Sequence, residues 1–381
     1  MLSQGRESHE KPKTFTYITI PVSGSLRPAG SSRRWSDEAL RIVQCDRGQS
    51  LSGVLGTAQP GDTIRVSGTC TETITITTDG LTLSGEAGAT IDGGGADENV
   101  VTIDGARNVS ITNFTVQNGN EGILAINDAT FALDDVTVQD NSSHAIELVR
   151  STGNFSNITS QRNGRVGLIV ARNSVANVTN ATLQQNLSGL VVFSNATVRL
   201  FGTILMNENA TQGLTVGLGG VLFSIGSELQ ANDNGAEGVF VLQDGKIQLI
   251  GGALEASRNQ TDGLNLQQNA TVILGIEAFG VPGTVVANDN AGHGIVAASG
   301  SDVAASAIMP LTSQGNGQMG LQLDDGSSAT ISGATIEGNG AADVDLTFGS
   351  RATLADNSIG TIACDETALL RGDTSATCPT P

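Results

Sequence analysis

Three residues with acid–base side chains stand directly before a glycine in successive repeats of the sequence. They are Glu237, Asp262 and His293, in the segments AEGV, TDGL and GHGI. If each repeat forms one coil of a stack, these side chains lie in a column with neighbours roughly 5 Å apart. Two carboxyl groups at that separation suit glycoside chemistry, one as acid and base and the other as nucleophile. These three residues are therefore the candidate catalytic trio of this sequence.

The same position varies widely in the other repeats, which favours solvated turn residues as the alternative. It is occupied there by Glu121, His144, Val166, Ser188, Gln212 and Met319. His144 by itself is more typical of a turn residue than of a metal ligand.

Four arginines gather within two repeats and suggest a second kind of chemistry. They are Arg150, Arg162, Arg165 and Arg172, and Arg165 falls near the position of His144. A lyase needs a basic group to remove a proton next to a carboxylate, usually with Ca²⁺ to neutralise that carboxylate. No aspartate cluster accompanies these arginines in the sequence, so solvated or ion-paired arginines are the alternative.

The repeat itself is marked by asparagine. Its first five copies begin at Asn118, Asn141, Asn163, Asn186 and Asn209, 22 or 23 residues apart, and later copies hold Asn234, Asn259, Asn290, Asn316 and Asn339. A period of this size indicates a solenoid. Asparagine tolerates left-handed backbone at a tight turn, and its amide can bond to the asparagine one coil away. We therefore expect a ladder of stacked asparagines that keeps the coils in register.

Short strands with alternating side chains fill each repeat. In one repeat we expect strands at 122–126, 130–136 and 137–141, with these side chains inside: Ile123, Ala125, Phe131, Leu133, Val136 and Val138. Strands this short cannot bury a face alone, so the coils must stack into three parallel sheets. The six-residue repeat of left-handed helices is absent, and parallel crossovers are right-handed. The predicted fold class is an all-β, right-handed parallel β-helix of about twelve three-strand coils.

The regions that flank the repeats differ in composition. Ser50 is a suitable N-cap for a short capping helix with Leu51, Val54 and Leu55 on one side. A loop that protrudes from the coils is expected around Pro282. The predicted division is a loosely attached leader at 1–44, an N-terminal cap with the first coils at 45–100, the β-helix at 101–362 and a C-terminal cap or tail at 363–381.

Four cysteines bracket the repeats. We predict two disulfides, Cys45 with Cys70 and Cys364 with Cys378, that fix the two ends in an oxidising, secreted setting. Free thiols in a cytosolic protein are the alternative. Residues 1–44 hold no apolar run long enough for a secretory signal. A removed signal, a misassigned start or another export route would account for this.

The charge balance excludes some partners. The net charge is −19 with three lysines, which argues against nucleic acid and anionic membranes and weighs against a polyanionic polysaccharide. No apolar run is long enough to span a membrane. No cofactor is required, although the three carboxylates of the glycine-rich loop 92–99 could hold Ca²⁺. An ordinary polar turn is the alternative for that loop.

The segment SLxxxLxxAxPGDTIxVxGTCxE (50–72) and the NxxxGI/L copies resemble the pectin-lyase-like superfamily of right-handed parallel β-helix proteins. The resemblance spans roughly residues 45–362. It implies the fold, but its members range from polysaccharide lyases, polygalacturonase-type hydrolases and uronate epimerases to tailspikes and adhesins without chemistry. The GHGI segment is similar to the Gly-His-Gly of polygalacturonases. Their paired aspartates and their Arg-x-Lys are missing here, which puts hydrolysis of that type in doubt.

Outward positions of the predicted GI and GL strands are mostly aliphatic. They are Leu124, Ile126, Ile169, Ala171, Val191, Phe240, Leu242, Val296 and Ala298. A contiguous apolar strip is typical of a protein interface. We therefore predict a secreted scaffold or surface-binding protein without catalytic activity that self-associates through this face. The alternative is a carbohydrate-active enzyme, a polygalacturonase-like hydrolase or a polysaccharide lyase or epimerase, that acts through Glu237, Asp262 and His293.

Overall fold

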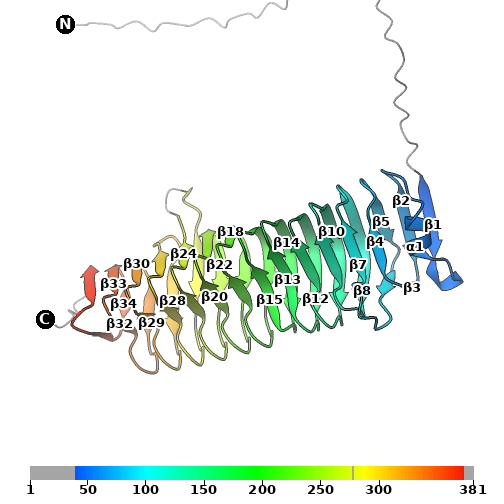
Figure 1. Ribbon diagram of the computed structural model, residues 1–381. Helices are drawn as coiled ribbons and strands as arrows, with labels where there is room; N and C mark the ends of the chain where they lie inside the picture. The colour runs from blue at the N-terminus through cyan, green and yellow to red at the C-terminus, as the bar shows by residue number, and fades with distance from the viewer. Residues whose placement is uncertain (1–38, 277–278, 373–381) are drawn as a thin grey trace, which may run out of the picture. The chain divides into compact units, whose positions relative to one another are not determined.

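Parallel strands stack coil upon coil throughout the described chain. The structure is a computed structural model that describes residues 39–276 and 279–372. Each strand pairs with the equivalent strand of the next coil (Figure 1). The described residues make about fourteen turns, more than the twelve predicted. The first and last coils lack the asparagine repeat, so the sequence pattern does not reveal them.

One face of the stack is a sheet of thirteen short strands, here called the thirteen-strand sheet. Its strands are β4 (Ile74–Ile76), β7 (Val101–Asp104), β9 (Ile123–Ile126), β11 (Ile146–Val149), β13 (Val166–Ala171), β15 (Ser188–Val192), β17 (Leu214–Val216), β20 (Val239–Leu242), β23 (Leu264–Gln267), β26 (Ile295–Ala297), β29 (Leu321–Leu323), β32 (Val344–Leu346) and β35 (Ile362–Cys364).

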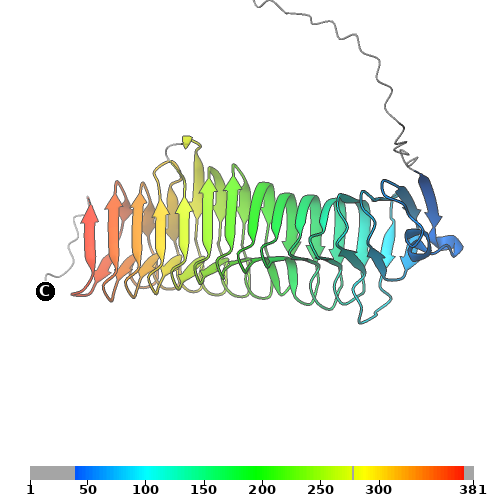
Figure 2. The same ribbon diagram turned by 45° about the horizontal axis from the view of Figure 1, so that its top comes forward.

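The other two faces form one continuous, bent sheet (Figure 2). Its strands are β1 (Leu40–Gln44), β2 (Thr63–Ser67), β3 (Thr69–Thr71), β5 (Thr82–Gly85), β6 (Thr90–Asp92), β8 (Val109–Gln117), β10 (Thr130–Gln139), β12 (Thr152–Gln161), β14 (Val175–Gln184), β16 (Thr197–Leu205), β18 (Val221–Ile225), β19 (Glu228–Gln230), β21 (Lys246–Ile250), β22 (Gly252–Glu255), β24 (Thr271–Leu274), β25 (Gly283–Val286), β27 (Asp302–Ala305), β28 (Leu311–Gln314), β30 (Ser328–Ser332), β31 (Thr335–Glu337), β33 (Arg351–Ala355), β34 (Ser358–Ile359) and β36 (Leu369–Gly372).

The expected division of each coil into three strands holds with one modification. In the coil that follows β9, the two predicted strands merge into β10, which bends at the exposed, left-handed Asp135. From β18 onward the second and third strands are separate. The predicted inward side chains, such as Ile123 and Phe131, are buried in one aliphatic core. Period-two alternation therefore placed the core correctly.

The N-terminal cap extends further towards the N-terminus than predicted. Residues 40–44, assigned by the sequence to the leader, form β1, which pairs in parallel with β2 and buries Val43. This strand covers backbone groups that would otherwise form an open sheet edge. Residues 1–38 of the predicted leader lie outside the described residues.

The predicted capping helix is α1 (Leu51–Leu55), and the side chain of Ser50 accepts from Gly53 N. Glu72 anchors the same end, because its carboxylate accepts from Leu51 N at 2.6 Å and Ser52 N at 3.0 Å. A carboxylate at a helix N-terminus satisfies backbone donors that have no partner within the helix. The cap is thus tied to the first coils by a side chain from β3's C-terminal end.

The cysteines fix the ends of the stack. Cys45, in the 3₁₀ helix η1 (Cys45–Arg47), and Cys70 on β3 form the predicted disulfide. Cys364 on β35 is disulfide-bonded as well. Its predicted partner, Cys378, lies outside the described residues. Because β35 and β36 still pair with the preceding coils, the β-helix continues beyond residue 362, where the sequence placed its end.

The asparagine ladder exists and is buried. Each Asn Oδ1 accepts the backbone N–H of the asparagine one coil earlier, and in most coils its side-chain N–H as well. Asn234 Oδ1, for example, lies 3.0 Å from Asn209 N and 3.2 Å from Asn209 Nδ2. The ladder runs through Asn141, Asn163, Asn186, Asn209, Asn234, Asn259, Asn290, Asn316 and Asn339.

Two details of the predicted ladder need correction. Asn118 is not a member: it lies one position earlier, and Gly119 N bonds to Asn141 instead. The left-handed residue of the turn is not the ladder asparagine but the residue before it, such as Asp140 or Arg162. The asparagine amide is used for hydrogen bonding alone, because its backbone does not need the left-handed conformation.

The ladder also explains why a glycine follows in the repeat. A Cβ on Gly238 would lie 2.6 Å from Asn259 Nδ2, closer than real contacts allow. The buried amide of one coil therefore requires a residue with little or no side chain beside it. The repeat therefore keeps a small residue wherever a ladder asparagine of the next coil packs against it.

We predict that Asn234→Ala destabilises the fold by about 2 to 4 kcal/mol, because it leaves the two buried donors of Asn209 without an acceptor. Chemical denaturation would measure the loss, and amide exchange at residue 209 would locate it. Asn177→Ala is the matched control, since Asn177 makes only an exposed side-chain bond to Asn154. An equal effect of the two substitutions would contradict the role of the ladder.

Candidate functional site

The three predicted catalytic residues do lie in one column. Each carbonyl of this column accepts the N–H of the glycine one coil earlier: Gly213 bonds to Glu237, Gly238 to Asp262 and Gly263 to His293, at 2.9 to 3.2 Å. The column stands at the N-terminal ends of β20, β23 and β26. The register inferred from the sequence was therefore correct.

Only two members of the trio come together. Asp262 Oδ1 lies 2.8 Å from His293 Nδ1 and 2.7 Å from His293 N. Glu237 accepts instead from Gln212 on the opposite side, at 3.0 Å. Burial alone would raise the pKa of Asp262, but the hydrogen bonds from His293 outweigh it and keep that pKa below its ordinary value. The carboxyl pair expected from Glu237 and Asp262 is thus replaced by an Asp–His pair.

A second cluster occupies the same column further towards the N-terminus. Single ligand atoms of Glu121, His144 and Glu147 lie within 4.8 Å of one another. Glu121 and His144 hold the position before the repeat's small residue, whereas Glu147 is an outward residue of β11 in register with Leu124 and Ile169. Arg165, one coil further, is close enough to act on their charges. Four titratable side chains from three coils therefore converge.

The sequence named Glu121 and His144 only as variable turn residues and missed Glu147. A signal was present, because Glu147 interrupts the aliphatic strand AIELV at a position where alternation points outward. Recognising the cluster required knowing which outward residue lies beside which turn residue.

The electrostatics of this cluster oppose the ionisation of Glu121. Burial and the nearby Glu147 carboxylate raise the pKa of Glu121 to about 7. Glu121 Oε2 is buried and has no hydrogen-bond partner among the described residues. A carboxyl group whose pKa lies near neutrality, beside a second carboxylate, is typical of acid–base catalysis.

The tautomer of His144 bears on metal binding. His144 Nδ1 accepts the backbone N–H of Val166 at 3.3 Å, so the proton of the neutral ring is on Nε2. Burial lowers the pKa of His144 and keeps the ring neutral. A metal at Nε2 would require the proton to move to Nδ1, where the Val166 N–H already points. The geometry therefore suits proton donation by Nε2 better than metal coordination.

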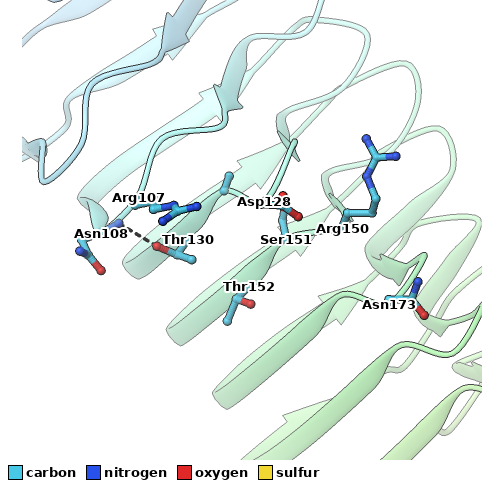
Figure 3. Close-up of a pocket in the computed structure, with 9 residues that line it drawn as sticks. Arg107, Asn108, Asp128, Thr130, Arg150, Ser151, Thr152 and Asn173 are labelled. Carbon is cyan, nitrogen blue, oxygen red and sulfur yellow. Dashed lines mark hydrogen bonds between the residues drawn. The ribbon is translucent and has the colours of Figure 1, made fainter.

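The arginines do not form the cluster that their sequence positions suggested. Arg162 pairs with Asp140 at 2.9 Å, and Arg165 alone joins the carboxyl cluster. Arg150 and Arg172 stand past the opposite ends of β11 and β13. Arg107 and Arg150 border a groove of about 590 Å³, on different coils on either side of Asp128 (Figure 3). That groove holds no histidine and one carboxylate, so it offers no acid–base pair.

The outward strip of the thirteen-strand sheet is less apolar than the sequence suggested. The predicted inside and outside phase is correct, and Leu124, Ile169 and Phe240 do point outward. However, they are half-buried, and polar residues share their column. These are Glu147, Thr215, Asn265, Gln322 and Asp345. The face therefore offers apolar contacts interrupted by hydrogen-bonding groups.

Two carboxylates of the glycine-rich loop 92–99, those of Asp92 and Glu98, accept hydrogen bonds from neighbouring residues. Asp92 accepts from Gln117, Asn118 and Gly94 N, each at 2.8 Å. Glu98 accepts from Thr73 at 3.1 Å. Calcium binding by this loop stays a prediction.

Residues 99–254 match the family described as "right handed beta helix region". Together with the stacked parallel coils of the described residues, this match supports one fold: the chain is a right-handed parallel β-helix. The sequence matches no curated protein. Within the described residues, the β-helix contains no helix long and apolar enough to cross a membrane.

Solved structures with a similar fold are remote. The mannuronan C-5 epimerase AlgE4 A-module of Azotobacter vinelandii is 13% identical, with 85% of this chain and 93% of that chain covered and a TM-score of 0.47. The polygalacturonase from Erwinia carotovora ssp. carotovora is 9% identical, with 86% and 92% covered and a TM-score of 0.36. The Dettilon tailspike protein is 12% identical, with 80% and 62% covered and a TM-score of 0.42. These similarities say nothing about the activity of this β-helix.

The raised pKa of Glu121 makes a prediction about stability. The folded state keeps the Glu121 proton up to about pH 7, whereas the unfolded state releases it near 4.5. The folded state therefore binds more protons in this window, and its stability falls as the pH rises through it. Glu121→Gln removes the titrating group. The melting temperature of the variant minus that of the wild type should therefore increase as the pH is raised from about 5 to about 8.

Thermal unfolding of both proteins across that pH range measures the difference. Glu237→Gln is the control, because Glu237 holds the same position of another coil but bonds to Gln212. A difference in melting temperature that does not change with pH would show that Glu121 titrates normally.

Proposed function

We propose that this β-helix is an extracellular carbohydrate-active enzyme that cleaves glycosidic bonds with the Glu121–Glu147 carboxyl pair. One observation carries the proposal: the environment keeps Glu121 protonated near neutral pH beside a carboxylate that raises its pKa. Carboxyl groups whose environments separate their protonation states are assigned as acid and base or nucleophile. The proposal adopts the enzyme alternative of the sequence but moves its site away from Glu237.

Each residue of the cluster has a role in this mechanism. Glu121 acts as general acid and protonates the leaving oxygen while Glu147 attacks the sugar and forms a glycosyl ester. Glu121, now ionised, takes a proton from water, which hydrolyses this ester and frees Glu147. One carboxyl oxygen of each lies within 4.8 Å of the other, which is shorter than the roughly 6.5 to 9.5 Å between the carboxyl groups of inverting enzymes and therefore favours the retaining arrangement. His144 donates from Nε2 to a sugar oxygen. Arg165 stabilises the Glu121 carboxylate that is left once its proton has been transferred.

A polymeric substrate suits the form of this face. The thirteen-strand sheet presents one outward side chain per coil in each column, so a ligand along the stack meets equivalent positions at each step. The outward column combines half-buried apolar contacts at Leu124 and Ile169 with polar groups at Glu147 and Gln322. Sugar rings have apolar faces and hydroxyl edges, and both are matched here. That members of the pectin-lyase-like type include polysaccharide-cleaving enzymes is a fold-level analogy.

The disulfide between Cys45 and Cys70 is compatible with an oxidising extracellular setting. The scaffold without catalytic activity remains the second candidate function. The half-buried apolar residues of the outward column support it, because they could also contact another protein.

A screen of neutral and uronate polysaccharides tests the enzyme. We expect new reducing ends without unsaturated products, and Glu121→Gln or Glu147→Gln should lower the rate by about a hundredfold or more. Glu237→Gln should leave the rate near that of the wild type. Unsaturated products would instead indicate a lyase, and the absence of turnover on every polysaccharide would favour the scaffold.

The pH dependence follows from the role of Glu121. A general acid works only while protonated, so kcat/KM should decline above about pH 7, where Glu121 loses its proton. Initial rates measured across the pH range would show this limb. An activity that keeps rising well above neutrality would exclude Glu121 as the acid.

A further inference from the structure

The Asp262–His293 pair has no part in the proposed reaction, yet several hydrogen bonds fix its geometry. It lies on the same face as the carboxyl pair. From β11 to β23 there are five strand spacings, about 24 Å. The side chains of His293 and Asp262 are 15% and 11% exposed. They therefore lie at the surface but are held in a defined place.

The hydrogen bonds of Asp262 fix the orientation of both its neighbours. Its carboxylate accepts from His293 Nδ1, so in the neutral ring the other nitrogen, Nε2, is left as an acceptor. Its second oxygen accepts from Asn265 Nδ2 at 2.8 Å. That bond prevents the amide from exchanging its nitrogen and oxygen, so Asn265 Oδ1 is fixed as an acceptor too.

Asn265 Oδ1 lacks a donor. The residue is 8% exposed, and this oxygen has no hydrogen-bond partner among the described residues. A buried acceptor without a donor is unfavourable for the fold, so a ligand hydroxyl that displaces the atoms covering this oxygen and donates to it would remove that cost. Asn265 stands in the outward column between Phe240 and Val296, where a ligand on this face would pass.

The surrounding charge selects the class of ligand. Asp262 is ionised, Glu237 precedes it by one coil, and Asp345 follows on β32. Within the described residues, Glu237 bonds to Gln212, and Asp262 bonds to Asn265 and His293, so neither carboxylate is paired with a lysine or arginine. A carboxylate or sulfate group would be repelled here, whereas neutral hydroxyls can donate to both free acceptors.

We propose that Asp262, Asn265 and His293 form a second carbohydrate-binding site that takes two neighbouring hydroxyl groups of a neutral sugar. One hydroxyl donates to His293 Nε2 and the other to Asn265 Oδ1, and Phe240 contacts the apolar face of the ring. This site depends on the proposed function in one respect: the polymer bound here would be the one that extends to Glu121 and Glu147. Binding itself requires no turnover.

An array of neutral and acidic glycans, probed with the full-length Glu121→Gln protein, tests the site without interference from cleavage. We expect binding to a neutral glycan, and a loss of affinity of about tenfold or more when Asn265→Leu or His293→Phe is added. Gln322→Leu is the matched control, because Gln322 is an outward amide of the same column with no bond to Asp262. It should leave binding unchanged.

The chain contains three histidines, His9, His144 and His293, so imidazole nitrogen NMR can observe the site directly. The glycan identified on the array should shift the His293 signals in the Glu121→Gln protein and leave them unshifted once Asn265→Leu is added. Asn265→Leu removes an unsatisfied buried oxygen and should still fold, as thermal unfolding will show.

The outcomes separate the two proposals. Binding that depends on Asn265 and His293 in a protein without enzymatic activity would retain the second site and reject the proposed function. If the protein is active, but Asn265→Leu and His293→Phe leave glycan binding unchanged, the proposed function is retained and the second site is rejected. A preference of these residues for acidic glycans would also overturn the second site.

Discussion

The structure depends on one buried amide per coil. Each ladder asparagine presents its Oδ1 to the backbone N–H of the coil before it, and its own N–H to the coil after it, in the interior of a turn where water is excluded. Without that oxygen, the turn would bury backbone donors at a cost of about 1 to 3 kcal/mol each. The same amide packs against the glycine of the neighbouring coil, so any side chain at Gly238 would push the coils apart. The contact between the asparagine amide and the glycine therefore sets both the register and the spacing of the coils.

That register makes the surface a regular grid. A strand that slips by one residue would exchange its inward and outward side chains, and the buried face prevents this. Residues 22 to 31 apart in the sequence, such as Asp262 and His293, are consequently neighbours in space. Chemistry can be assembled on such a grid by changing single outward or turn residues, because none of them contributes to the core. Glu147 illustrates this, since it occupies a position that holds aliphatic residues on both adjacent coils.

The two polar clusters retain features that the fold alone would not keep. Glu121 carries a carboxyl group whose ionisation is opposed by burial and by Glu147, and its Oε2 lacks a donor. Asn265 leaves an oxygen unpaired next to an oriented histidine. Elsewhere, buried polar groups such as Asn234 and Ser301 are bonded from coil to coil. Ser350 Oγ is a third buried side-chain atom without a partner among the described residues and belongs to neither cluster. At Glu121 and Asn265 the unpaired oxygen lies beside titratable side chains, a combination typical of functional sites.

The sequence by itself determined the fold class, the inward side chains and the column of residues before the repeat glycine, because period-two alternation and a fixed repeat are local properties of the chain. It also indicated the capping helix at Ser50 and the Cys45–Cys70 disulfide. The sequence could not show that Glu237 turns towards Gln212 while Asp262 turns towards His293, since both directions are open to a side chain in a column. Nor could it join Glu147, a strand residue, to Glu121 and His144, which are turn residues of two coils. Only the tertiary structure decided these contacts, because side-chain direction and burial depend on neighbours that lie one coil away.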